Sequence, residues 1–106
     1  MNATTEWSDI GMLNDFKEGA PVRADIGDHA IAVYRIGDEV YAIGDVCPHQ
    51  KNVRLSEGFF DGSTIECPRH QSCFDVRTGK VISPPARQDV RRYPVMIQGG
   101  KVFIGV

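Results

Sequence analysis

The chain has 106 residues, of which 42% are hydrophobic, and its formal net charge at pH 7 is −2. A chain of this length builds one domain with one modest core, so we expect a single domain over residues 1–106. The slight acidic excess argues against nucleic acid as a partner, and no apolar run approaches the ~18 residues that a membrane-spanning helix needs.

The first part of the sequence predicts short β-strands separated by turns. An opening strand is expected at Glu6–Ser8, with Trp7 as a core anchor. Residues 22–26 alternate apolar and polar side chains, which is typical of a strand with one buried face. Gly-Asp pairs then turn the chain twice, and two more apolar strands are predicted at 30–34 and 40–43.

Two loops in the middle of the chain each carry one Cys and one His. Cys47 and His49 belong to the first loop, Cys67 and His70 belong to the second, and seventeen residues separate His49 from Cys67. A proline follows each cysteine, which fixes φ and stiffens the loop. Two thiolates and two imidazoles are enough to hold a metal centre.

The rest of the chain continues as strands and turns. The polar stretch 50–58 allows a single helical turn, Asp61-Gly62 is a hairpin signal, and strands at 64–66 and 72–76 should flank the second loop. Ser83–Ala86 is too rich in proline for a central strand. A last hairpin is predicted from residues 90–97 and 101–106. The expected class is all-β, with about seven to ten short strands.

Two metal centres fit the four candidate ligands. Zinc takes Cys and His in a tetrahedral site, but zinc sequences usually begin with a C-x2–4-C pair and end with an H-x3–5-H pair. A [2Fe–2S] cluster can instead take two Cys on one iron and two His on the other. Here each loop is mixed, and the spacing is C-x-H-x17-C-x2-H.

That spacing, and the run C-P-R-H-Q-S-C-F-D-V-R-T-G-K after it, resemble the Rieske [2Fe–2S] ferredoxins over nearly the whole chain. The resemblance implies an antiparallel β-sandwich with a small cluster-binding insert at about residues 45–74. It also implies that Cys47, His49, Cys67 and His70 ligate the cluster, and that the proline-rich segment covers one side of it.

The resemblance further implies the function of a soluble carrier that passes single electrons from a flavin-containing, NAD(P)H-dependent reductase to a terminal oxygenase that hydroxylates aromatic rings. The alternatives are the small Rieske-like subunit of an assimilatory nitrite reductase and a zinc-stabilised binding module. We expect no enzymatic activity of its own, because only His29 remains for a second, mononuclear iron site.

The sequence also predicts a compartment, an oligomeric state and a docking surface. The N-terminus lacks the blocks of a signal peptide, and two of the three cysteines, Cys47 and Cys67, are assigned to the cluster, which leaves no pair for an internal disulfide. Both observations suit the reducing cytoplasm, and a monomer is expected. Cys73 is predicted to be buried beside Phe74, and His29 to be an ordinary surface residue. The docking rim is predicted from Gln50, Lys51, Pro84 and Pro85.

Respiratory Rieske proteins, which the ligand loops also resemble, link these loops by a disulfide and hydrogen-bond the cluster sulfurs with Ser and Tyr hydroxyls. The matching positions here are Asn52 and Arg69 for the disulfide, and Ser72 and Phe74 for the hydroxyls. Asn52 and Arg69 cannot form the disulfide, and Phe74 has no hydroxyl to donate to a cluster sulfur. The resemblance therefore implies a reduction potential near the lower end of the Rieske range.

Overall fold

The computed structural model describes residues 6–48, 52–69 and 71–106. These residues form eleven strands and two single-turn 3-10 helices, so the predicted all-β class is confirmed and the expected strand number was slightly low. The strands are β1 (Trp7–Met12), β2 (Val22–Arg23), β3 (Ile31–Ile36), β4 (Glu39–Gly44), β5 (Phe59–Asp61), β6 (Thr64–Glu66), β7 (Cys73–Asp75), β8 (Val81–Ser83), β9 (Arg92–Tyr93), β10 (Val95–Gln98) and β11 (Lys101–Gly105); the helices are η1 (Leu13–Asp15) and η2 (Leu55–Glu57).

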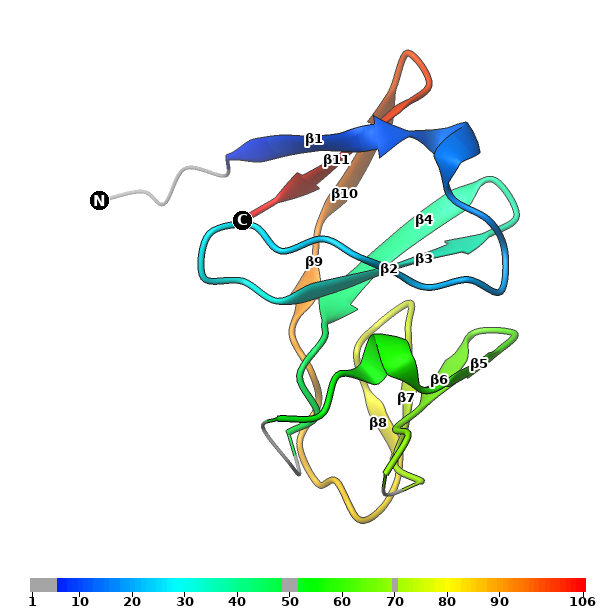
Figure 1. Cartoon of the computed structure of the whole chain (residues 1–106), viewed down its shortest axis with the longest axis vertical. Coiled ribbons are helices and arrows are strands. Elements are labelled where there is room, and N and C mark those ends of the chain that lie inside the picture. Colours follow the sequence, from blue (N-terminus) through cyan, green and yellow to red (C-terminus); the bar gives the residue numbers. More distant parts are fainter. Residues whose placement is uncertain (1–5, 49–51, 70) are drawn as a thin grey trace.

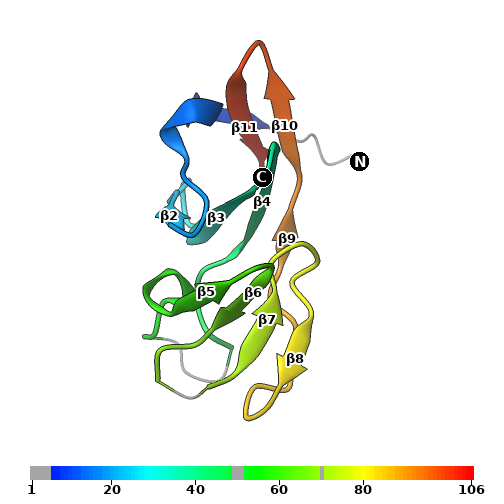
Figure 2. The same cartoon turned by 90° about the vertical axis from the view of Figure 1, so that its right-hand side faces the viewer.

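The strands make three antiparallel sheets, in the orders β1-β11-β10, β2-β3-β4-β9 and β5-β6-β7-β8. The first two sheets enclose one apolar core, which includes Val33, Ala42, Tyr93 and Ile104. The third sheet lies at one end of this sandwich (Figures 1 and 2). No helix in the described part of the chain is long and apolar enough to cross a membrane.

Strand β3 is buried on both faces, which explains why its sequence is a run of apolar residues rather than an alternating one. Ile31 and Val33 face the core of the sandwich, whereas Ala32 and Tyr34 face a second core shared with the third sheet. This second core therefore joins the third sheet to the sandwich formed by the first two sheets.

Two expectations about strands were wrong. Residues 90–97 are not one strand, because Pro94 has no N–H to give to a ladder; β9 pairs with β4, and β10 pairs with β11 in a different sheet. The insert also extends beyond residue 74, since β8 completes its sheet by pairing with β7.

Trp7 was wrongly predicted to anchor the core. Its side chain is 43% exposed, because β1 is an edge strand and Trp7 lies on its outward face with Asp9, whereas Ile10 packs inward. An aromatic residue alone does not show which face of a strand is buried.

Candidate metal centre

The first ligand loop leaves β4 and is closed at its base by backbone pairing. The amide of Cys47 donates to the carbonyl of Val53 over 3.0 Å, and Val46 forms an antiparallel bridge with Arg54. The Cys47 side chain is fully buried. The loop therefore starts and ends in fixed backbone, with the thiol turned into the protein.

A buried carboxylate reinforces the same closure. Asp45 is fully buried, and its oxygens accept hydrogen bonds from Nε of Arg54 (2.8 Å), the amide of Ser56 (2.6 Å) and Oγ of Ser56 (2.7 Å). The backbone of Asp45 also pairs with Ala30 and Leu55. One side chain thus joins the segment that enters the loop to the segment that leaves it.

Arg54 extends this network to the sandwich formed by the first two sheets, through Asp25. Its Nη2 atom lies 2.8 Å from Oδ1 of Asp25, and this hydrogen bond lowers the pKa of the Asp25 carboxyl below its usual value. The two carboxylates in turn raise the pKa of Arg54. The guanidinium therefore stays charged and connects the first ligand loop to the segment between β2 and β3.

The second ligand loop is the turn of the β6–β7 hairpin, as predicted. The amide of Cys67 donates to the carbonyl of Ser72 over 2.7 Å, and Gln71 closes the turn with a φ of 60°. The Cys67 side chain is 1% exposed. This loop is therefore also rigidly held, with its thiol buried.

The proline-rich segment lies against the second loop. Oγ of Ser72, which is fully buried, accepts a hydrogen bond from the amide of Ala86 over 2.9 Å. Oγ of Ser83 accepts from the amide of Cys73 (3.2 Å) and donates to the carbonyl of Gln71 (3.4 Å). The segment is thus held beside the second ligand loop, and its role in covering the cluster stays a prediction.

Both cysteines belong to one apolar core, which they share with Leu55, Ile65 and Phe74. His49 and His70 lie outside the described residues, and within the described ranges no three His, Cys, Asp or Glu side chains converge. Two buried thiols presented by two closed loops fit the sulfur half of a His2Cys2 cluster site. The apolar surroundings also suit a group whose potential depends on the exclusion of water.

Two other sequence predictions near the site need correction. Cys73 is only half-buried, on the face of β7 opposite Phe74, and its Sγ lies 3.6 Å from the carbonyl of Gln71. His29 is not an ordinary surface residue: it is half-buried, its Nδ1 is hydrogen-bonded to the hydroxyl of Tyr93 at 3.0 Å, and the two rings meet edge-on.

Sequence reasoning missed Asp45, Arg54 and Tyr34. A signal for Asp45 was available, since a lone acid between an apolar strand and a buried cysteine must find partners. Tyr34 is fully buried next to Phe60, and its hydroxyl has no hydrogen-bond partner among the described residues. Burial, and then the charge of Asp45, raise the pKa of Tyr34.

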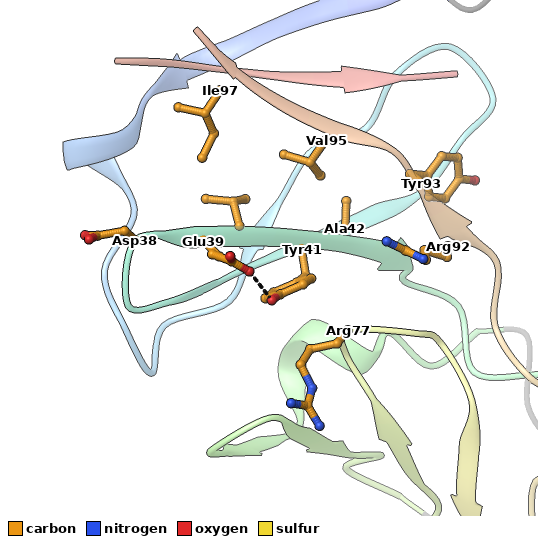
Figure 3. A pocket seen from close by; sticks show the side chains of 10 residues that line it. Asp38, Glu39, Tyr41, Ala42, Arg77, Arg92, Tyr93, Val95 and Ile97 are labelled. Atoms are coloured by element: carbon orange, nitrogen blue, oxygen red, sulfur yellow. Dashed lines mark hydrogen bonds between the residues drawn. The ribbon is translucent and has the colours of Figure 1, made fainter. Parts of the chain in front are cut away.

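A separate hollow of about 410 Å³ lies between β4, β10 and the turn that carries Arg77 (Figure 3). Tyr41 donates a hydrogen bond to Glu39 on its wall, which raises the pKa of the tyrosine, and Arg92 lies at the other end. Among the described residues, none from either ligand loop lines this hollow, and we therefore distinguish it from the candidate metal centre.

Comparison with known proteins agrees with this geometry. A model of the "Rieske [2Fe-2S] domain" family matches residues 6–94. The ferredoxin subunit of anthranilate 1,2-dioxygenase from Burkholderia cepacia is 42% identical over 95% of this chain and 93% of its own.

Solved structures show the same fold. The ferredoxin of carbazole 1,9a-dioxygenase from Nocardioides aromaticivorans IC177 superposes with a TM-score of 0.88 at 36% identity, over 96% of this chain and 97% of that one. A ferredoxin solved in complex with the oxygenase of a carbazole 1,9a-dioxygenase gives 0.86 at 36% identity, over 92% and 91% of the two chains. A putative nitrite reductase small subunit from Mycobacterium tuberculosis gives 0.86 over 98% and 97%, but at 22% identity it shows the fold alone.

Proposed function

The chain belongs to the Rieske [2Fe–2S] domain family, and we propose that it is the ferredoxin component of a multicomponent aromatic-ring dioxygenase system. The observation that carries this proposal is the 42% identity, over nearly the full length of both chains, to a ferredoxin of such a system. The chain is an electron carrier and not a catalytic oxygenase. Its cofactor is the Rieske-type [2Fe–2S] cluster of its family.

The proposed ligands are Cys47 and Cys67 on one iron, and His49 and His70 on the other. Both thiols are buried in the described structure, in one core and on two closed loops, which supports the cysteine half. The histidines are proposed from the sequence spacing. When bound, the cluster accepts and releases single electrons, and His ligation places its potential at about −150 to +300 mV.

The protein's own residues contribute position and shielding. The Asp45–Arg54 pair and the Cys67–Ser72 backbone bond fix the two loops before any partner arrives. Leu55, Ile65 and Phe74 keep water from the buried thiolates. A rigid site changes little between oxidation states, and little reorganisation is what rapid electron transfer needs.

The partners follow from the family role. A terminal oxygenase is the electron acceptor, as in the solved complex of a related ferredoxin. We propose a flavin-containing NAD(P)H-dependent reductase as the donor, a monomeric state, a single domain over residues 1–106, and the cytoplasm as the compartment. That compartment supplies the reduced thiols that the cluster requires.

The two earlier alternatives are less well supported. A nitrite reductase subunit shares the fold, but its similarity in sequence is far lower than that of the dioxygenase ferredoxin. A zinc-stabilised module would not be expected to match the [2Fe–2S] family over residues 6–94.

Reconstitution tests the proposal directly. The purified protein should be red-brown, with about two irons and two acid-labile sulfides per chain. Added to a purified reductase and ring-hydroxylating oxygenase, it should make NAD(P)H-driven hydroxylation depend on its concentration. A colourless protein with one zinc, or a coloured one that supports nitrite reduction and no hydroxylation, would refute the assignment.

A further inference from the structure

The charges of this chain are unevenly distributed between the cluster end and the rest. Three segments make up the cluster end: the loops 47–53 and 67–72 and the proline-rich segment 83–88. They contain three Lys or Arg residues and no Asp or Glu, which leaves nine basic and fourteen acidic residues elsewhere. The cluster end therefore carries +3, and the remainder carries −5, within a chain of net charge −2.

The structure brings the described parts of these segments together. Pro48 of the first loop and Pro85, Arg87 and Gln88 of the proline-rich segment line one hollow of about 470 Å³. The bond from the Ala86 amide to Ser72 joins the same segment to the second loop. The described parts of both loops and this segment lie at the end of the molecule farthest from β1 and β11 (Figure 1).

The cations at this end are available to a partner. Arg69 and Arg87 are exposed, and within the described ranges neither forms an ion pair. By contrast, five other basic residues do form ion pairs with acids of this chain: Arg23, Arg35, Arg54, Arg77 and Lys101. Lys51, the third cation of the cluster end, lies outside the described residues.

Glu66, Asp89 and Asp28 lie beside these segments, and among the described residues none of them forms an ion pair with Arg69 or Arg87. Asp89 follows the proline-rich segment, but its Oδ1 accepts a hydrogen bond from the amide of Val81 over 2.9 Å, back toward β8. Asp28 shares a neighbouring hollow with Pro48 and does not line the one with Arg87.

We propose that the cluster end is an electropositive docking surface for an acidic patch on the terminal oxygenase, with Arg87 and Arg69 meeting its carboxylates. This inference rests on the proposed function. The hollow beside Arg87 admits an acidic side chain between two rigid prolines. The negative remainder of the molecule repels the same patch, so the charge asymmetry steers the cluster end toward its acceptor and raises the association rate.

Small oxidants test the local charge without any partner. The reduced protein is mixed in a stopped-flow instrument with ferricyanide, an anion, or with hexaammineruthenium(III), a cation; each takes one electron and leaves the protein oxidised. Despite the net negative charge of the chain, the ferricyanide rate should fall with ionic strength and the ruthenium rate should rise. Opposite slopes would overturn the proposal.

Matched arginine variants test which residues supply the positive charge that ferricyanide meets. Arg87→Gln and Arg69→Gln should each slow the ferricyanide reaction at low salt by at least about fivefold, which is the effect of one pair of unit charges near contact in water, because ferricyanide carries three negative charges. Arg92→Gln makes the same change of net charge at an exposed arginine of β9, outside the three segments of the cluster end, and should have little effect. Equal effects of all three variants would overturn the proposal.

A second experiment, with the oxygenase as the electron acceptor, tests the proposed partner. The rate of reduction of the oxygenase that accepts electrons in the reconstitution assay should fall with salt, and should fall for Arg87→Gln but not for Arg92→Gln. A rate that rises with salt would show a basic partner and refute the inference. Loss of the visible cluster spectrum or of hydroxylation in the wild type would instead refute the proposed function, so the two failures are distinguishable.

Discussion

Nε of Arg54 donates a hydrogen bond of 2.8 Å to Oδ2 of the fully buried Asp45, and this pair spans the base of the loop that carries Cys47. A buried acid is stable only when its partners are all in place. The pair therefore ties the geometry of the first ligand loop to the stability of the whole insert.

Removal of the Asp45 carboxylate should lower the stability of the fold. Asp45→Ala leaves the Arg54 side chain, which is only 25% exposed, without its buried partner, and frees both donors of Ser56. We expect a loss of about 3–5 kcal/mol in the free energy of unfolding, together with faster bleaching of the cluster, measured by denaturant titration and visible absorbance. Arg23→Gln, which breaks the exposed pair with Glu57, is the control and should cost at most about 1 kcal/mol. Equal losses would contradict the special role of Asp45.

The three cysteines should respond differently to substitution. Cys47→Ser and Cys67→Ser should each abolish cluster assembly and destabilise the domain, because metal binding is coupled to folding. Cys73→Ser changes a half-buried side chain on the outward face of β7 and should retain iron, sulfide and colour. Iron and sulfide analysis of the three purified variants checks this, and a colourless Cys73→Ser would show that the ligand set is misassigned.

Much of this arrangement could be predicted because it depends on local patterns. The two Cys-Pro loops, the hairpin around Cys67 and the strand alternation each involve residues close in sequence. The misplaced features depend on distant contacts. Nothing near Trp7 shows that β1 is an edge strand, and nothing near His29 points to Tyr93, sixty-four residues away.

The contacts of the buried Asp45 also could not be predicted from the sequence, because its partners lie in other segments. Asp45, Arg54 and Asp25 are recognisable individually as charged residues, but only the folded chain shows that one guanidinium joins two carboxylates from different segments. Pro94 is the opposite case, since its missing N–H was visible in the sequence and should have divided the last predicted strand.

Low pH should weaken the ion pair between Arg54 and Asp25. The pKa of Asp25 is lowered in the folded protein by its hydrogen bond to Arg54, so its contribution to stability is present above the usual carboxyl pKa and is lost as pH falls through the lower, folded value. Asp25 is largely exposed, so this contribution should be about 1 kcal/mol or less. Asp25→Asn should lower the free energy of unfolding at pH 7, and its difference from the wild type should disappear as pH falls below the lowered pKa of Asp25. Asp61→Asn, at an exposed acid with no ion pair among the described residues, is the control. A difference that persists at low pH would exclude the charge mechanism.

The last prediction concerns Ser72, whose hydroxyl oxygen already accepts the amide of Ala86. A hydroxyl that accepts one bond still has its proton to donate, and a bond to a cluster sulfur stabilises the reduced, more negative state and raises the potential. Such a bond is worth roughly 1.5–3 kcal/mol, and about 1.4 kcal/mol corresponds to ~59 mV for one electron. Ser72→Ala should therefore lower the potential by on the order of 100 mV and also destabilise the fold, because the Ala86 amide loses its acceptor.

Potentiometry separates these two roles of Ser72. A potential that stays constant while the free energy of unfolding falls would mean that the serine only anchors the proline-rich segment. The buried Phe74 has no hydroxyl to offer, so the wild type should lie near the lower end of the Rieske range, at about −150 mV. Phe74→Tyr should raise this value by tens of millivolts where the added hydroxyl reaches a ligand thiolate. A wild-type potential well above zero would contradict this prediction, because a centre that oxidising is poorly suited to reduce an oxygenase.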